Sequence, residues 1–310
     1  MILSVSRRTD IPAFYSKWFM NRLRDGFVYV RNPFNSKQIS RVNIKPEVVD
    51  CIVFWTKNAK PLTPHLREID LRGYKYYFHF TITPYGQDLE QRIVNKTKII
   101  DTFKRLSSRI GPQKVILRYD PIILTDKYSK EYHIKAFTKI CNLIKGYTDR
   151  IVSSFLDNYR KVSRNMKGID VKELSRSDIA EQFSIIATTH GLSLETCAEA
   201  VVPFSSGIKR GKCIDGDLIE KIIGNPIKYK DSLDGNRQDC GCMKCIDIGQ
   251  YDSCIHNCLY CYANVNKKRT LQNYKSHDPK SPILFGEYDE SNVKERKDVK
   301  SYLIDRGLLG

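Results

Sequence analysis

Three cysteines near the C-terminus have a spacing that suits an iron–sulfur cluster. Cys254, Cys258 and Cys261 form the pattern CxxxCxxC. Three thiolates on one tight loop can each bind one iron of a [4Fe–4S] cluster, which leaves the fourth iron open to a small molecule or a substrate. A zinc site is the alternative, but zinc favours four ligands in paired CxxC knuckles, and His256 lies inside the same tight loop. The spacing therefore predicts a site-differentiated [4Fe–4S] cluster, with these three cysteines as its ligands.

Apolar runs alternate with helical patterns over the first two hundred residues. Six runs predict strands, at Ile2–Ser6, Asp50–Lys57, Tyr76–Thr83, Lys114–Ile123, Arg150–Asp157 and Leu192–Glu199. Helices are expected between them, among others at Ala13–Arg24, Gln87–Ser107, Glu131–Ile144 and Ser175–His190. Such alternation is typical of parallel strands joined by helices. We therefore predict an α/β fold, a partial or complete (β/α) barrel of the TIM type.

Each predicted strand ends in polar side chains. In a (β/α) barrel the carboxyl ends of the strands converge on one mouth, where catalytic residues lie, whereas an open sheet brings together only the strands beside its switch point. Arg118 and Asp120 follow an apolar run directly and are costly to bury without a partner or ligand. The residues expected to contact substrate or transfer protons are Arg7, Arg8, Asp10, Lys57, Arg118, Asp120, Asp157 and Glu199. Those expected to contact a cofactor are Ser6, Thr9, Thr56, Asn58 and Tyr260.

The composition changes after the sixth predicted strand. From Gly207 onward Gly, Asp, Asn and Cys become frequent and regular periodicity fades. Such a segment lacks the apolar residues for a core of its own, so we expect bound metal to stabilise its fold. The predicted organisation is a barrel core over residues 1–206 with a small hairpin at 28–42. A Cys-rich iron–sulfur segment over 207–310, with a charged tail, packs on the barrel and closes its mouth.

The chain is strongly basic. Its net charge is +17, and most of the excess lies before Phe204. A basic surface suits a polyanion, so an anionic substrate such as DNA or RNA is one interpretation. A lysine-rich surface that only confers solubility is the other, since no arginine-rich run or nucleic-acid motif is present.

Three further features of the sequence indicate where in the cell the protein lies. No apolar run approaches the roughly 20 residues that a membrane span needs. The first residues, MILSVSRRTDIP, lack the apolar stretch of a secretory signal. Ten cysteines, six of them between Cys240 and Cys261, fit metal or redox chemistry better than disulfides. We therefore expect a cytoplasmic protein without membrane contacts.

The cysteine triad resembles that of radical S-adenosylmethionine (SAM) enzymes. The aromatic Tyr260 before the third cysteine and Tyr262 after it make the run similar to the Cys-x-Tyr-Cys-Tyr of spore photoproduct lyases. The resemblance implies that SAM binds the open iron and that an electron from an external donor cleaves it. In those enzymes the triad usually follows the first strand, whereas here it follows the sixth. A permuted barrel would reconcile the two, with the triad loop lying against Ser6–Asp10.

The whole chain resembles the bacterial domain-of-unknown-function family numbered 1848. The motifs that carry this resemblance are Ser6–Pro12 (SRRTDIP), Arg31–Pro33 (RNP), Phe54–Asn58 (FWTKN), Arg118–Pro121 (RYDP), Cys197–Glu199 (CAE), Cys213–Asp215 (CID), Cys240–Cys242 (CGC) and the CxxxCxYCYA run. The family implies a radical-SAM-like cluster and no particular reaction.

Four further cysteines belong to those motifs: Cys197, Cys213, Cys240 and Cys242. Four thiolates suffice for a second [4Fe–4S] cluster or for a zinc ion, with Cys245 as a spare ligand. The alternative is that they are unpaired thiols packed as small apolar groups, which is what we expect of Cys51 and Cys141.

Two functions follow from these patterns. The first is a radical-SAM-like iron–sulfur enzyme that acts on an anionic substrate, with nucleic acid among the candidates. The second is a non-catalytic nucleic-acid-binding protein stabilised by an iron–sulfur cluster or zinc. Carboxylates at the barrel mouth favour the enzyme, because they would repel a phosphate backbone.

Overall fold

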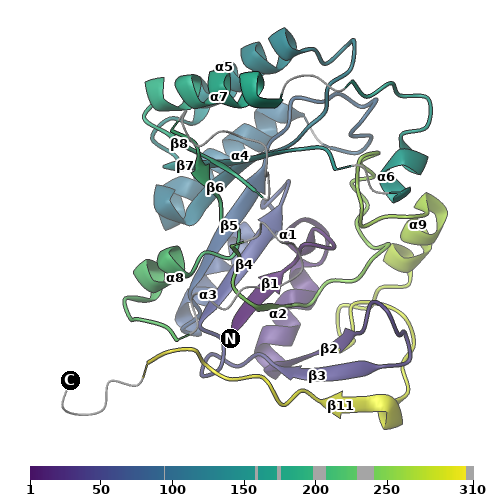
Figure 1. Cartoon of the computed structure of the whole chain (residues 1–310). Coiled ribbons are helices and arrows are strands. Elements are labelled where there is room, and N and C mark those ends of the chain that lie inside the picture. The colour runs from purple at the N-terminus through teal and green to yellow at the C-terminus, as the bar shows by residue number, and fades with distance from the viewer. Residues whose placement is uncertain (94, 158–159, 173–175, 198–206, 229–240, 305–310) are drawn as a thin grey trace.

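Eight parallel strands form one sheet in the computed structural model, which describes residues 1–93, 95–157, 160–172, 176–197, 207–228 and 241–304 (Figure 1). The order across the sheet is β10–β1–β4–β5–β6–β7–β8–β9. These strands span Ile2–Val5 (β1), Cys51–Thr56 (β4), Tyr76–Thr81 (β5), Val115–Ile122 (β6), Arg150–Phe155 (β7), Ser193–Thr196 (β8), Lys209–Arg210 (β9) and Cys245–Asp247 (β10). The six predicted strands are thus confirmed, in sequential order, and two short strands flank them.

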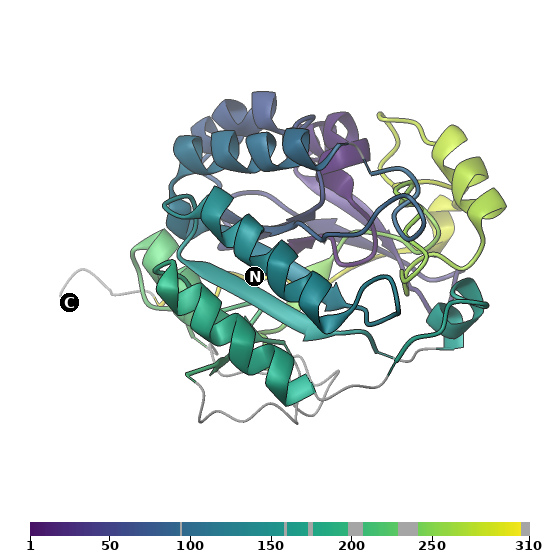
Figure 2. The same ribbon diagram turned by 90° about the horizontal axis from the view of Figure 1, so that it is seen from above.

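Helices cover one face of this sheet (Figure 2). The helices that contribute to the large core there are α1 (Ile11–Phe14), α2 (Ser16–Asp25), α3 (Leu66–Leu71), α4 (Lys96–Ile110), α5 (Lys130–Ile144) and α7 (Arg176–Thr189). The remaining helices are α6 (Arg160–Asn165), α8 (Gly216–Ile223) and α9 (Lys267–Lys275), with short 3₁₀ turns η1 (Thr63–His65), η2 (Pro112–Lys114) and η4 (Glu290–Asn292). None of the helices in the described residues is long and apolar enough to cross a bilayer.

The two faces of the sheet differ in chemistry. On β5, Phe78 and Phe80 belong to the core under the helices, whereas Tyr77 belongs to a smaller cluster on the opposite face. Strand residues alternate between faces, so His79 shares the face of Tyr77. We call this second face, which α8 packs against through Ile219, the inner face. The inner face carries the polar residues toward the carboxyl ends of the strands.

The α/β class is confirmed, but closure of the sheet into a barrel is not. The hydrogen-bonded ladder ends at β9 on one side and β10 on the other, and within the described residues these two strands do not pair with each other. The sheet is therefore open, with its last strand in sequence, β10, added beside β1. The Cys-rich segment contributes two strands to the sheet as well as the loops that follow β10.

A second, three-stranded sheet lies beside the first (Figure 1). The predicted hairpin is confirmed as β2 (Phe27–Arg31) and β3 (Ile39–Asn43), which pair antiparallel. The tail adds β11 (Val293–Glu295) parallel to β3.

One predicted helix begins later than the sequence pattern indicated. Gln87–Ser107 was expected to be helical, but α4 starts at Lys96, with Asn95 as its N-cap. The segment before α4 instead binds the triad loop. Glu90 forms an isolated β-bridge with Cys258, and the amide of Leu259 donates to the carbonyl of Leu89. A contact with a distant segment has overridden the local helical pattern.

Candidate functional site

The cysteine triad lies on the loop after β10, next to the end of β1. Strand β10 pairs parallel with β1, so the loops that follow both strands emerge at the same end of the sheet (Figure 1). The hydroxyl of Tyr262 donates to the carbonyl of Arg7 at 2.7 Å, and that of Tyr15 to the carbonyl of Ser253 at 2.6 Å. These bonds hold the loop against the segment that follows β1, next to which the triad loop was expected to lie.

Asp247, the last residue of β10, orders the turn after β1. Its carboxylate accepts hydrogen bonds from the hydroxyls of Ser4 (2.8 Å) and Ser6 (2.6 Å) and from the amide of Arg7 (2.7 Å). Gly249 follows closely, and a Cβ there would lie 2.0 Å from the Ser6 hydroxyl oxygen. Any side chain at position 249 would collide with Ser6. Gly249 therefore allows the turn after β1 to pack directly against the chain that follows β10.

Asp10 joins three segments of the site. Its carboxylate accepts hydrogen bonds from the hydroxyl of Thr56 and the amide of Lys57, both at 2.7 Å, and from the amide of Ala13 at 3.0 Å. Nε2 of His256, inside the triad loop, lies 2.7 Å from the same carboxylate. Asp10 therefore connects the ends of β1 and β4 to the triad.

The three triad thiols lie close together in a half-buried position. Burial raises the pKa of Cys254, Cys258 and Cys261, in the case of Cys258 to about 12, and their mutual electrostatic repulsion adds to the effect. The amide of Ala263 donates to Sγ of Cys261 at 3.4 Å. In the structure these three side chains are therefore neutral thiols, and they would have to lose their protons in order to bind a metal.

Several buried polar atoms near the triad have no hydrogen-bond partner. The side chains concerned come from the turn after β1 and from the triad loop: Thr9 Oγ1, Gln250 Nε2, His256 Nδ1 and Asn264 Oδ1. Buried polar atoms are usually satisfied, so such a concentration is consistent with a bound group in this region. The donor set and these atoms together fit a cluster with a small ligand.

The arrangement does not suit a single ion. Across the residues that the structure describes, no three His, Cys, Asp or Glu side chains are placed to hold one metal ion. A cubane cluster differs from a single ion in this respect, because each thiolate binds a different iron.

A buried carboxylate that the sequence analysis missed lies beside the triad. Glu90 is 1% exposed, and its carboxylate binds the ammonium groups of Lys57, at 2.8 Å, and of Lys96. It also accepts hydrogen bonds from the hydroxyls of Thr83 and Tyr260. Lys57 is thus neutralised within the protein, and Tyr260 is held by its hydroxyl. Nothing in the local sequence singled out Glu90, which lay in a predicted helix.

Arg118 and Asp120 form an ion pair on the inner face. Nε and Nη2 of Arg118 both donate to one oxygen of Asp120, at 3.1 and 2.6 Å. The hydroxyl of Ser154 donates to the other oxygen. The guanidinium carbon also lies 5.3 Å from the centre of the Trp55 ring, which stacks on His79. The two residues that follow the apolar run are therefore partners of each other, and their charges compensate.

A second group of cysteines meets next to Arg118. Sγ of Cys197 and Sγ of Cys213 are 3.3 Å apart, and Nη1 of Arg118 donates to Sγ of Cys213 at 2.9 Å. Sγ of Cys242 accepts hydrogen bonds from the amides of Cys213 (3.2 Å) and Ile214 (3.4 Å). Three of the four cysteines predicted for a second site are thus brought together, whereas Cys240 lies outside the described residues.

The remaining predicted residues have mostly local contacts. Asn58 accepts from the amide of Lys60 at 3.2 Å and so serves a local turn. The amide of Arg8 donates to the Ser6 hydroxyl at 2.9 Å, and its guanidinium carbon lies 5.4 Å from the centre of the Tyr251 ring. Asp157 follows β7 in a half-buried position, and Glu199 lies outside the described residues. Cys51 and Cys141 are buried among apolar residues.

Cys245 and Arg150 show contacts that the sequence did not indicate. Nη2 of Arg7 donates to Sγ of Cys245, on β10, at 3.2 Å. Nη1 of Arg150 binds Asp215 at 2.6 Å and Glu195 at 3.3 Å, which fixes the start of α8 to the inner face.

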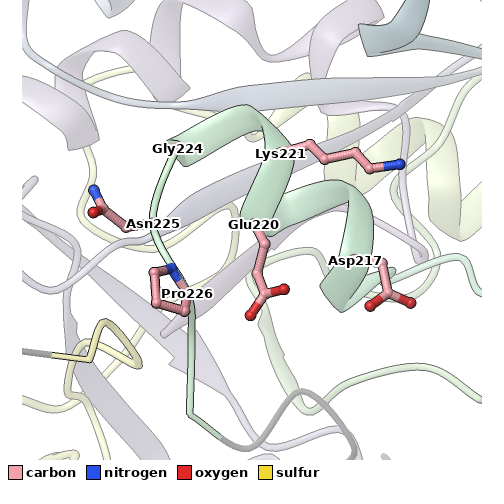
Figure 3. A pocket seen from close by; sticks show the side chains of 6 residues that line it. All are labelled: Asp217, Glu220, Lys221, Gly224, Asn225 and Pro226. Carbon is pink, nitrogen blue, oxygen red and sulfur yellow. The ribbon is translucent and has the colours of Figure 1, made fainter.

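One hollow of the surface lies away from this chemistry. It has a volume of ≈ 340 Å³ and is lined by Asp217, Glu220, Lys221, Gly224, Asn225 and Pro226, at the outer side of α8 (Figure 3). None of the residues of the two cysteine groups lines it. We therefore place the functional site on the inner face and at the carboxyl end of β1, not in this hollow.

Comparison with known proteins gives a family but no reaction. A family model described as a domain of unknown function (DUF1848) matches residues 2–263. No curated protein and no solved structure matches the chain. The matched range includes both groups of cysteines and every strand of the eight-stranded sheet.

Proposed function

Since this chain belongs to the DUF1848 family, whose description names no reaction, we propose from the site itself that it is a radical-SAM-like iron–sulfur enzyme acting on an anionic substrate. In this proposal Cys254, Cys258 and Cys261 hold a site-differentiated [4Fe–4S] cluster. When bound, the cluster supplies the electron that cleaves SAM, and an external donor in the cytoplasm restores it.

The observation that carries the proposal is the contact between His256 and Asp10. It ties the loop of the triad to the ends of β1 and β4, where parallel strands present their polar residues. A purely structural cluster has no need of such a position. The triad, Asp10 and Lys57 instead share one end of the sheet with the Arg118–Asp120 pair.

Residues of the chain have separable roles in this proposal. Asp10 and Asp247 position the triad loop and the turn after β1 through the hydrogen bonds described above. Lys57 lies close enough to Cys258 and Cys261 to influence their charge electrostatically, and Glu90 fixes its ammonium group. A cation beside the sulfurs stabilises their thiolate forms, which are the forms that bind iron.

Substrate contacts are assigned to groups that face the site from neighbouring strands. Asp120 and Ser154 form one polar patch on the inner face. Arg7 and Arg8 are half-buried after β1 and supply positive charge for an anionic substrate. The net charge of +17 would also attract polyanions such as DNA or RNA to the protein over longer distances.

The experiment that tests the proposal compares metal content and spectra. The wild-type chain, purified anaerobically, should contain iron and sulfide, and its reduced form should give an electron paramagnetic resonance signal that changes when SAM is added. The variant Cys254→Ala/Cys258→Ala/Cys261→Ala should lose about four irons per chain. Cys141→Ala, in the core of α5, is the matched control and should keep them.

Cleavage of SAM is measured separately from the iron content. Reduced wild-type protein with SAM should release 5′-deoxyadenosine, and the triple variant should not. Unchanged iron in the triple variant would show that the triad is not the ligand set. Iron without any effect of SAM would leave a cluster whose role is structural.

A further inference from the structure

The ends of β8 and β9 bring two cysteine sulfurs into contact. Cys197 directly follows β8 and Cys213 comes shortly after β9, and these two strands pair in parallel. The two Sγ atoms are 3.3 Å apart, across a separation of 16 residues along the chain. The amide of Cys197 also donates to the carbonyl of Ser153, on β7, at 3.1 Å. The pairing of the strands therefore holds the two sulfurs next to each other.

The spacing of these sulfurs suits a disulfide better than a metal site. The thiolates of a cubane each bind a different iron, which keeps their sulfurs farther apart than the 3.3 Å between Cys197 and Cys213. A single ion would need a third ligand, and no suitable trio of His, Cys, Asp or Glu side chains occurs within the described residues. A disulfide needs no further ligand, only an approach of the two sulfurs to about 2.05 Å. Both cysteines are free in the structure, so they are able to form such a bond.

The groups around the buried sulfur favour its thiolate form. Nη1 of Arg118 donates to Sγ of Cys213 at 2.9 Å. Hydrogen bonds from Cys197 and Cys242 hold the pKa of Cys213 well below its ordinary value, and the nearby guanidinium adds to this effect. The thiolate is the reactive form of a cysteine, so Cys213 is prepared for nucleophilic attack.

The two cysteines differ in how far solvent reaches them. Cys213 is 4% exposed, whereas Cys197 is only half-buried. A dissolved reagent therefore meets Cys197 first. Thiol–disulfide exchange proceeds through a mixed disulfide, which a second thiolate then resolves. An accessible sulfur in contact with a buried thiolate supplies both parts of this reaction.

We propose that Cys197 and Cys213 are a redox-active pair that reduces a small organic disulfide such as oxidised glutathione. In the first step the proton on Cys197 passes to Cys213, and the sulfur of Cys197 attacks one sulfur of the small disulfide. The S–S bond of the reagent breaks and a mixed disulfide forms on Cys197. The thiolate that leaves takes the proton from Cys213.

The second step closes the protein disulfide. Sγ of Cys213 attacks Sγ of Cys197, the bond to the reagent breaks, and the second thiolate leaves and takes a proton from water. The pair thereby loses two electrons, and the small disulfide gains them and becomes two thiols. Oxidation removes the thiolate that Arg118 binds, while its ion pair with Asp120 remains. The reaction does not depend on the iron chemistry proposed for the triad.

The test treats the full chain, purified anaerobically, with oxidised glutathione and then blocks the remaining thiols with N-ethylmaleimide. Peptide mass spectrometry should find a disulfide-linked peptide that contains Cys197 and Cys213, and dithiothreitol should remove it. The control Cys141→Ala should give the same linked peptide. Alkylation of both cysteines without a linked peptide would overturn the proposal. Protection of both cysteines that only a chelator removes would equally overturn it, because the pair would then hold a metal.

The variant Cys213→Ser separates the two steps. Without the second sulfur, Cys197 should keep one glutathione as a mixed disulfide, and the release of the second glutathione thiol should slow by at least about tenfold. An unchanged release in this variant would show that Cys213 does not resolve the mixed disulfide and would contradict the proposal. If Cys213→Ser does not fold, the linked peptide of the wild-type chain decides the question.

Discussion

Nε2 of His256 lies 2.7 Å from Oδ2 of Asp10, across a separation of 246 residues. The contact joins the loop of the cysteine triad to the segment that ends the first strand. Both side chains are buried, at 6% exposure each. The site is therefore assembled from the two ends of the matched family range.

Asp10→Asn should loosen this junction. The carboxylate accepts hydrogen bonds from Ala13, Thr56 and Lys57 in addition to its contact with His256, and an amide offers only one acceptor oxygen. We expect a loss of about 3 kcal/mol in the free energy of unfolding, measured in urea, because hydrogen bonds to charged groups are each worth about 1.5–3 kcal/mol. Cys254, Cys258 and Cys261 should also react faster with an alkylating reagent in the same variant, because the loop that carries them is held less firmly.

The matched control for this prediction is Asp101→Asn. Asp101 pairs with Arg105, and the two side chains are 56% and 78% exposed, so its loss should cost less than about 1 kcal/mol. Equal effects of the two substitutions would mean that Asp10 has no special part in the junction.

Glu90→Gln should leave two partly buried ammonium groups without their partner. Removing one member of a buried ion pair typically costs about 3–5 kcal/mol. The further replacement of Lys57 and Lys96 by Met should recover much of this loss, since it removes the unpaired charges. Chemical denaturation of the single and triple variants measures both effects.

The surface carboxylate Glu68 provides the control for Glu90. It pairs with Arg24 and Arg72, but its side chain is 31% exposed. Solvent screens such pairs, so Glu68→Gln should change the unfolding free energy by less than about 1 kcal/mol. A Glu90→Gln variant as stable as wild type would show that the buried network contributes nothing.

His133 should make stability depend on pH. Burial lowers the pKa of this residue below its ordinary value, and it lies between the Tyr119 hydroxyl (2.8 Å) and the carbonyl of Ile123 (3.0 Å). The unfolded chain then binds a proton at a higher pH than the folded one, so stability falls as pH decreases below about 6.5. His133→Gln should flatten that part of the curve, measured as unfolding free energy against pH, whereas His65→Gln should not.

The net charge of +17 predicts binding to nucleic acid. Fluorescence anisotropy with duplex DNA should detect binding at low salt, with log K falling by about 0.9 per phosphate contact for each unit of log salt. Arg8→Ala should reduce this slope by about one contact, whereas Arg105→Ala, on α4, should leave it unchanged. Absence of binding at low salt would restrict the substrate to small anions.

Long apolar runs made most of the sheet predictable. The six runs from Ile2–Ser6 to Leu192–Glu199 contain the six central strands, because buried parallel strands are almost continuously apolar. The two edge strands were not predicted. Lys209–Arg210 and Cys245–Asp247 are too short and too polar to show a period, and only their partners define them.

The site was predictable where residues follow a strand. Asp10 belongs to the polar segment after β1, and Arg118 and Asp120 follow the apolar residues that begin β6. Glu90 and Lys96 gave no such signal, since they lie in a segment whose path depends on the distant triad loop. Spacing alone could group the cysteines by motif, but only the fold shows that Cys197 contacts Cys213.

The pairing of β1 with β10 has a consequence for the order of biosynthesis. The ribosome makes β1 first, and six further strands of the main sheet and the hairpin emerge before β10 follows. Until then the nascent protein exposes β1 as an unpaired edge, with Ser4, Ser6 and the amide of Arg7 lacking the carboxylate of Asp247. Assembly of the triad loop against the end of β1 is therefore a late event, which follows translation of most of the chain.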